Sequence, residues 1–228
     1  MSNQAPMQPI SATLLTSLLS SARLEAYRLL PTDTHRMLLG RYRWNVALCM
    51  SLYPVLGYLE VAFRNSLHMA LTGMYSTPAW FDVSPSVLKS DEQEAIEAAK
   101  KALRKRGVAV EPNRMVAELS FGFWTGLLRT EYEQVLWPKL LAAVFPGMPR
   151  KHRTRQAVSN RMHTVRRLRN RVFHHEPIWR LQHLPQRNDD LRDTLTWFDR
   201  DLLRLFPSSH TFEEIHAQGP TAHEQDVK

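Results

Sequence analysis

The sequence RNRVFHHEPI, from Arg169 to Ile178, contains the end of a basic helical pattern, which is followed by the proline Pro177. Ten Lys or Arg residues and a single acid, Glu176, lie between Arg150 and Arg180, which gives this segment a formal charge of +9. The whole chain of 228 residues carries +8. The positive charge is therefore concentrated on one segment, as expected where a polyanion binds.

A helical repeat over about residues 154–175 places one apolar stripe on this segment. The stripe is made of Val158, Met162, Val165, Leu168 and Val172. Arg169 falls in the middle of the stripe, whereas Arg167 and Arg171 point away from it. A guanidinium on a packing face needs a partner, because desolvating it alone costs several kcal/mol. Two interpretations stay open: Arg169 pairs with a buried acid such as Glu60, or it binds a ligand.

The composition favours an all-α fold. The chain has only 8 Gly, a poor helix former, and is rich in the good helix formers Leu, Ala, Arg and Glu. The single cysteine, Cys49, excludes an internal disulfide and is expected to be a buried core residue. Helices are expected over residues 11–30, 34–53, 55–74, 92–106, 113–127, 132–145, 154–174 and 191–206. Glu60 and Arg64 lie one turn apart in the third of these and are expected to pair.

The chain is expected to form a single domain over residues 11–208. Residues 1–10 are expected to be a disordered lead-in, and residues 209–228 a short helical or disordered tail. Pro146 to Pro149 has the composition of a linker. The most apolar stretch, residues 44–63, is interrupted by polar residues and Pro54, so it predicts a buried helix pair and no membrane span. A cytoplasmic protein is the expectation.

The residues after Leu168 offer what RNA cleavage requires. The 2′-hydroxyl beside each scissile phosphate is a nucleophile, so cleavage needs a base, an acid and a cation that stabilises the developing charge. Histidine serves either proton role and arginine binds phosphate. Arg169, His174 and His175 supply these groups, and Asn170 can donate a hydrogen bond to the phosphate or fix a histidine tautomer.

The helical geometry complicates a site made by one chain. Asn170 and His174 share a face, but Arg169 and His174 are ~140° apart on an ideal helix. The helix could unwind before Pro177, or two chains could pool their residues across a two-fold axis. The alternative for the histidine pair is a purely structural role at a helix C-terminus. No metal site is expected, because adjacent helical residues point apart and no His-Glu-x-x-His pattern exists.

Four stretches carry a family resemblance. The run Arg169-Asn170 followed by His174-His175-Glu176-Pro177 resembles the motif of the HEPN superfamily, and in particular its Abi-like (abortive-infection) branch. Residues 42–45 (YRWN), 60–65 (EVAFRN) and 118–124 (ELSFGFW) match the same branch in the same order. The resemblance covers roughly residues 20 to 205. It implies a HEPN-type helical bundle with additional N-terminal helices.

The resemblance also implies a function. The expectation is a metal-independent RNA endonuclease without cofactors, which acts as a toxic effector in phage defence. Its partners would be RNA, a second copy in a homodimer, and an antitoxin or regulatory RNA; the alternative is a non-catalytic dimeric RNA-binding module. The expected catalytic residues are Arg169, Asn170, His174 and His175. The expected RNA-binding residues are Arg161, Arg166, Arg167 and Arg171, and the expected supporting residues are Glu60, Arg64, Asn65 and Glu176.

Overall fold

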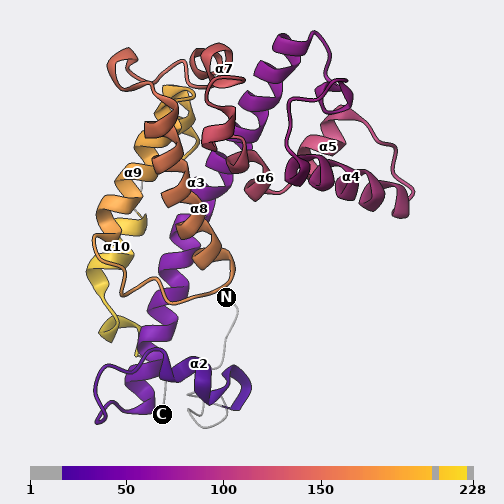
Figure 1. The fold of residues 1–228 in the computed structure, drawn as a ribbon. Coiled ribbons are helices and arrows are strands. Elements are labelled where there is room, and N and C mark those ends of the chain that lie inside the picture. The colour runs from indigo at the N-terminus through magenta and orange to yellow at the C-terminus, as the bar shows by residue number, and fades with distance from the viewer. Residues whose placement is uncertain (1–16, 207–210, 225–228) are drawn as a thin grey trace, which may run out of the picture. The chain divides into compact units, whose positions relative to one another are not determined.

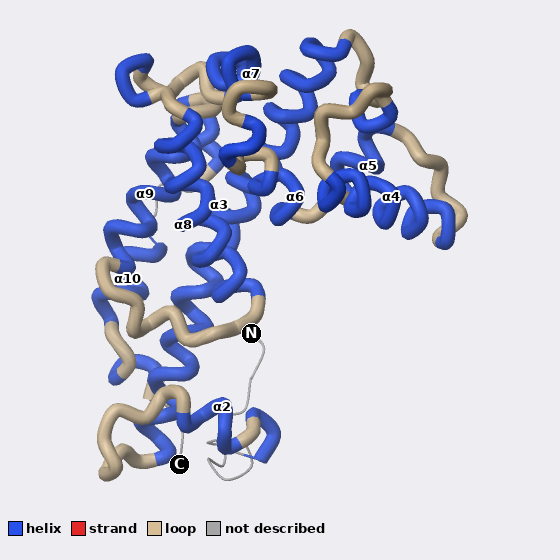
Figure 2. Tube along the Cα trace, in the orientation of Figure 1, coloured by secondary structure: helices blue, strands red, loops and turns tan. Residues whose placement is uncertain are grey.

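A computed structural model describes residues 17–206 and 211–224 of the chain. The described residues form helices joined by loops and contain no strand, which confirms the all-α class (Figure 1, Figure 2). The α-helices are α2 (Ser21–Glu25), α3 (His35–Tyr75), α4 (Ser90–Lys105), α5 (Pro112–Glu118), α6 (Phe121–Gly126), α7 (Trp137–Val144), α8 (Arg155–Phe173), α9 (Leu184–Thr196) and α10 (Thr211–Gln218). Short 3₁₀ turns cover Trp80–Asp82, Thr130–Tyr132, Arg150–His152, Arg200–Leu205 and Thr221–His223.

The described chain divides into two compact units. Unit 1 consists of residues 17–54, 170–189 and 211–224, and unit 2 consists of residues 55–169 and 190–206. The division falls within the continuous helices α3, α8 and α9. The expectation of a single domain over residues 11–208 therefore stays a prediction. The expected lead-in of residues 1–10 lies outside the described residues.

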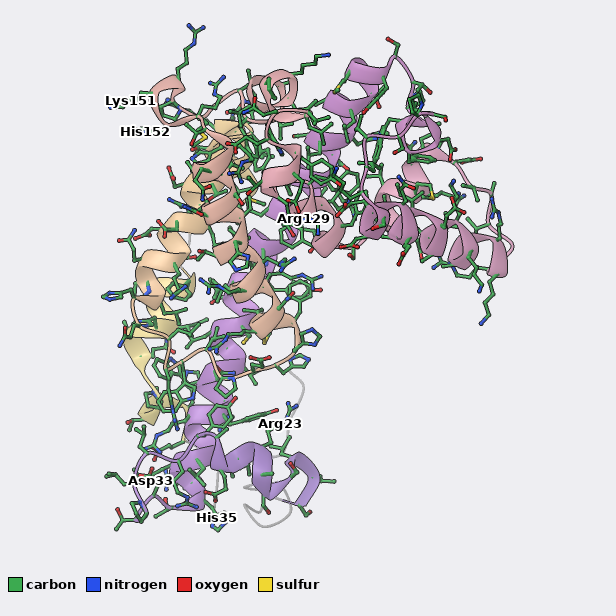
Figure 3. All side chains as sticks on the ribbon, viewed as in Figure 1. Arg23, Asp33, His35, Arg129, Lys151 and His152 are labelled. Atoms are coloured by element: carbon green, nitrogen blue, oxygen red, sulfur yellow. The ribbon has the colours of Figure 1, made fainter. Side chains whose placement is uncertain are left out.

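Unit 1 has an aromatic core around the residues that follow α8. Trp179 stacks on Tyr27 with ring centroids 6.2 Å apart, and the Trp44 indole donates to the carbonyl of Ile215 at 2.8 Å. Beside them, Asp33 forms a buried ion pair with Arg41 at 2.5 Å (Asp33 is labelled in Figure 3). The Arg41 guanidinium and two backbone amides hold the pKa of the Asp33 carboxyl well below its usual range. Charge and aromatic packing together fix this small core.

Unit 2 has a larger core in which helices far apart in sequence meet. Phe63 of α3 stacks on Phe145 at 6.0 Å, and Trp124 and Trp137 are fully buried. The Phe121 to Trp124 cluster is buried apart from Gly122. The expected linker at Pro146–Pro149 is instead docked: the Gly147 amide donates to the Trp197 carbonyl at 2.9 Å. A Cβ at Gly147 would lie 2.1 Å from the Thr196 carbonyl oxygen, so only glycine fits.

Several predicted boundaries were wrong. The expected helix pair around Pro54 is one continuous helix, because packing along α3 outweighs the lost hydrogen bond and the steric clash of the proline. The helix expected over 113–127 is broken at Leu119, where Ser120 caps α6 by accepting from the Phe123 amide at 3.2 Å. Pro185 lies inside the first turn of α9, where its missing N–H costs nothing, and α9 ends at Thr196 well before the predicted 206.

α3 is long and apolar enough to cross a membrane by length and composition alone. In its most apolar window, 39% of the residues are buried within the protein. A core helix of a soluble protein passes the same test. The cytoplasmic location therefore stays a prediction.

Candidate functional site

The motif helix forms as predicted. α8 spans Arg155–Phe173, and the Thr154 hydroxyl caps it by accepting from the Ala157 amide at 3.1 Å. The five residues of the predicted apolar stripe are all at most 3% exposed: Val158, Met162, Val165, Leu168 and Val172. The spacing of apolar residues therefore identified the buried face of α8 correctly.

Arg169 forms an ion pair with Glu60 of α3 within unit 2. The Arg169 Nε lies 3.1 Å from Glu60 Oε2, and the two side chains are 24% and 19% exposed. This is the pair that the sequence suggested for a structural role. The partial exposure of both groups leaves the guanidinium accessible from solvent, so the contact is compatible with either interpretation of Arg169.

The three expected supporting residues of α3, which are Glu60, Arg64 and Asn65, differ in their contacts. Glu60 pairs with Arg169, and the expected pair between Glu60 and Arg64 is not among the ion pairs of the described residues. The Arg64 side chain is half-buried, and its Nε is one of the buried nitrogens without a hydrogen-bond partner in the part of the chain that is described. Asn65 is exposed. Of these three residues, only Glu60 contacts the motif helix through an ion pair.

α8 ends in a Schellman motif formed by the two histidines and Glu176. The His175 amide donates to the Val172 carbonyl at 3.2 Å, and the Glu176 amide donates to the Arg171 carbonyl at 2.9 Å. His175 adopts a left-handed conformation with φ of 55°. Glycine is the usual residue at this position, so a histidine here costs conformational energy, as is common at functional sites.

His174 directly follows the last residue of α8. Its amide donates to the Asn170 carbonyl at 2.9 Å, so the imidazole and the Asn170 side chain are one helical turn apart. His174 is exposed, and so is Asn170. α8 ends at Phe173, so the helix does end before Pro177, which was one of the two alternatives for a site made by one chain. The imidazole is therefore presented to solvent at the end of the basic helix.

Asn45 of α3 fixes the chain that follows the histidines. Its Oδ1 accepts from the amides of Ile178 at 2.7 Å and Trp179 at 3.2 Å, and its Nδ2 donates to the Glu176 carbonyl at 3.4 Å. The side chain is buried, with 2% exposure. Asn45 lies in one of the stretches that carry the family resemblance, but the sequence did not identify it as a site residue. A polar residue within an apolar helical stretch was the only signal available.

An apolar groove of about 510 Å³ lies beside His175 within unit 1. Its lining comes from one face of α3 and the end of α8. Several of the α3 side chains are exposed there, with Met50 at 69% and Tyr53 at 55%, and Tyr53 stacks on Phe173 at 4.6 Å. Cys49 also lines the groove, although it is buried, and burial raises the pKa of its thiol to about 11. The thiol is therefore protonated at neutral pH, in agreement with the predicted packing role.

The four arginines expected to bind RNA differ in their surroundings. Arg161 is held by ion pairs with Asp190 at 3.2 Å and Asp193 at 3.6 Å, and its guanidinium lies over the Trp197 ring. Arg166 donates to the Thr125 hydroxyl at 3.2 Å. Arg167 is exposed, and Arg171 is exposed with Glu176 3.7 Å away.

Basic side chains are also exposed in the turn before α8. Lys151 and His152 lie there, labelled in Figure 3, and both are exposed. Since Arg161 is tied to two acids, it is the least suited of the four predicted arginines to contact RNA. The remaining arginines keep the surface of α8 strongly basic.

Among residues 17–206 and 211–224, no group of three or more His, Cys, Asp or Glu side chains is placed to hold a metal ion. Comparison with known proteins found no matching family model, no matching curated protein and no matching solved structure. The assignment to the Abi-like branch therefore remains a resemblance carried by the four stretches of sequence.

Proposed function

We propose that this protein is a metal-independent RNA endonuclease of HEPN type that acts as a toxic effector in abortive infection. The observation that carries the proposal is the end of α8. His174 is exposed there, one turn after Asn170, and Asn45 fixes the chain immediately beyond it. A proton-transferring imidazole held at the end of a strongly basic helix suits cleavage of a polyanion.

The proposed reaction uses the substrate's own 2′-hydroxyl. His174 takes the proton of this hydroxyl as its oxygen forms a bond to the neighbouring phosphorus, and the bond from phosphorus to the 5′-oxygen breaks. The leaving 5′-oxygen then receives a proton from the protonated His174. Arg169 and Asn170 bind the phosphate and stabilise its charge, as guanidinium and amide groups do for oxyanions. His175 supports the turn.

We further propose that the active form is a homodimer that uses the apolar groove beside His175. The motivation is the angle of ~140° between Arg169 and His174 on an ideal helix, which a second copy would overcome by completing the set. The exposed Met50 and Tyr53 offer an apolar surface at the end of the motif, of the kind that associating proteins bury. An antitoxin or regulatory RNA would be a further partner.

The second candidate function is a non-catalytic dimeric RNA-binding module. The Arg169–Glu60 ion pair favours it, because a paired guanidinium serves a structural role without any substrate. Under this alternative the basic surface of α8 binds RNA and no bond is broken.

Incubation of the purified protein with end-labelled RNA tests the proposal. Cleavage should leave a 2′,3′-cyclic phosphate and a 5′-hydroxyl, proceed in EDTA, and spare a DNA of the same sequence, which lacks the 2′-hydroxyl. Arg169→Ala should abolish cleavage while the variant keeps its fold. Glu60→Gln is the matched control, because it removes the same ion pair but leaves the guanidinium. It should keep most of the activity.

The outcomes separate the two candidate functions. If Glu60→Gln and Arg169→Ala lose cleavage and stability together, Arg169 has a structural role. If wild-type protein binds RNA without cutting it, the RNA-binding module is the better description. For the dimer, mixed Arg169→Ala and His174→Ala chains should regain activity if each site needs one residue from each chain. Full activity of a monomer in light scattering would contradict the dimer.

A further inference from the structure

The loop between α2 and α3 in unit 1 exposes two neighbouring leucines. Leu29 is 56% exposed and Leu30 is 59% exposed, and the two residues that follow them are exposed as well. We call residues 29–32 the leucine loop. Figure 3 labels Arg23, Asp33 and His35 at the end of unit 1 that carries it. Single exposed apolar residues are normal on a protein surface, whereas apolar residues grouped at a loop tip mark a candidate interaction surface.

A buried carboxylate holds the leucine loop in one conformation. The Asp33 Oδ2 accepts hydrogen bonds from the amides of Leu29 at 2.7 Å and Leu30 at 2.9 Å. The Asp33 amide in turn donates to the Leu30 carbonyl at 3.0 Å. The Asp33 side chain is 1% exposed and pairs with Arg41, whose guanidinium also donates to the Tyr27 carbonyl at 3.0 Å. The exposed leucines are therefore presented by a fixed turn.

The same bonds satisfy the backbone at the tip of the loop. Both amides of the leucine pair donate to Asp33, and Pro31 has no N–H to satisfy. The Leu30 carbonyl accepts from the Asp33 amide, and the Pro31 carbonyl accepts from Arg28 at 3.5 Å. Unpaired backbone groups make entry into an apolar medium costly. Residues 29–31 can therefore lose contact with water without leaving an amide unpaired.

Cations surround the leucine loop, and the acids near it are already paired. Residues 17–41 contain four arginines and two acids, Glu25 and Asp33, so their formal charge is +2. Both acids pair with arginines, Glu25 with Arg28 at 2.7 Å. Arg180 is exposed, and it donates to the Arg28 carbonyl at 2.6 Å, immediately before the leucine pair. An anionic surface would therefore meet uncompensated positive charge beside the leucines.

An apolar tip among cations fits a membrane surface better than a protein pocket. A protein partner needs a preformed pocket that receives two adjacent side chains, whereas lipid headgroups part around a projecting tip. The leucines would enter the boundary between headgroups and acyl chains, and the arginines would lie at the level of the anionic headgroups. Both contributions are needed, because a single weak signal gives only marginal membrane binding.

We propose that the leucine loop attaches the protein to the surface of membranes that contain anionic lipids. Leu29 and Leu30 insert, and Arg180 lies near the lipid phosphates. Attachment of this kind needs no helix that crosses the membrane. The inference concerns where the protein acts and does not depend on RNA cleavage, so a protein without nuclease activity would still bind through this loop.

Co-sedimentation of the wild-type protein with lipid vesicles tests the inference. The probe is a vesicle of equal parts phosphatidylglycerol and phosphatidylcholine, and the comparison is a vesicle of phosphatidylcholine alone. Binding to the anionic vesicle should be at least ~10-fold stronger, because each arginine near a negatively charged surface adds to the attraction. High salt should weaken this binding, since it screens the charges.

A substitution that removes no charge separates the loop from the basic surface of α8. The whole protein carries a formal charge of +8, so α8 alone could draw it to an anionic vesicle. The double variant Leu29→Ser, Leu30→Ser should weaken binding roughly tenfold or more, because two apolar side chains no longer leave water. Leu205→Ser in unit 2 is the matched control, since Leu205 is 53% exposed. It should change binding less than about twofold.

A second measurement leaves both leucines in place. An environment-sensitive fluorophore attached at Thr32→Cys should shift its emission to shorter wavelength on anionic vesicles, because it enters an apolar layer. The same fluorophore at Asn160→Cys, an exposed position of α8, should not shift. The native Cys49 is buried and should not take up the label.

The outcomes decide between the leucine loop and other surfaces. Loss of binding in the leucine variant, together with a shift at Thr32, supports the inference. It is overturned if the leucine variant and Leu205→Ser bind equally well, or if the fluorophore shifts at Asn160 and not at Thr32. It is also overturned if the wild-type protein binds no anionic vesicle, in which case the loop is a surface for the apolar pocket of a protein.

Discussion

The two units hold their parts of the motif by different interactions. Unit 2 holds Arg169 by a half-exposed ion pair with Glu60. Unit 1 holds residues 176–179 by neutral hydrogen bonds from the buried side chain of Asn45. An ion pair near solvent is weak and exchanges partners readily, whereas buried hydrogen bonds between amide groups are costly to break. The comparison indicates that the contact between Arg169 and Glu60 is the weaker of the two, while the turn after the histidines is fixed.

The largest expected effect is on activity in unit 1. His174→Ala should reduce RNA cleavage roughly 100-fold or more, because it removes a group that transfers protons. The unfolding midpoint should hardly change, since the side chain is exposed. His35→Ala removes another exposed histidine of the same unit and serves as the control in single-turnover assays. Equal activities of the two variants would remove His174 from the site.

The next largest effect tests how firmly unit 1 holds the turn. Asn45→Ala leaves the amides of Ile178 and Trp179 buried without acceptors and should cost about 2–4 kcal/mol of unfolding free energy. Asn65→Ala removes an exposed amide from the same helix and should cost less than about 0.5 kcal/mol. Urea unfolding monitored by circular dichroism measures both. A small effect of Asn45→Ala would show that aromatic packing around Trp179 is sufficient to hold the turn.

The matching substitution in unit 2 should have a smaller effect. Glu60→Gln keeps a hydrogen-bond acceptor but removes the charge, and for a half-exposed pair it should cost about 1 kcal/mol or less. The difference between wild type and variant should shrink in high salt, which screens such pairs. Urea unfolding at low and high salt measures this. A loss as large as that for Asn45→Ala would remove the contrast between the two units.

The smallest effect concerns the left-handed residue at the end of α8. His175→Gly should stabilise the protein by roughly 0.5 kcal/mol, because glycine adopts positive φ without steric cost but has more freedom when unfolded. Thermal unfolding detects this change. Cleavage within a few-fold of wild type would confirm a supporting role for His175. A loss as large as that of His174→Ala would make it a catalytic residue.

The sequence was most informative where one periodicity dominates. The bounds of α8, its buried face and the partner of Arg169 all follow from the spacing of apolar residues and the need to neutralise a guanidinium. The breaks at Leu119 and Thr196 and the continuity of α3 through Pro54 were missed, because tertiary packing outweighs local preference at each of them. The role of Asn45 was also missed, since its partners lie more than 130 residues later.

The same bonds of Asn45 have a consequence for synthesis. The hydrogen-bond partners of its side chain are two amides and a carbonyl that lie 131 to 134 residues further along the chain. The nearby Trp44 indole needs the carbonyl of Ile215, which is 171 residues away. Contacts of such separation form late, and a chain is made from its N-terminus. The turn after the histidines is therefore completed only after residues 176–179 and Ile215 have left the ribosome, so nascent chains and truncated products without these residues lack a formed site.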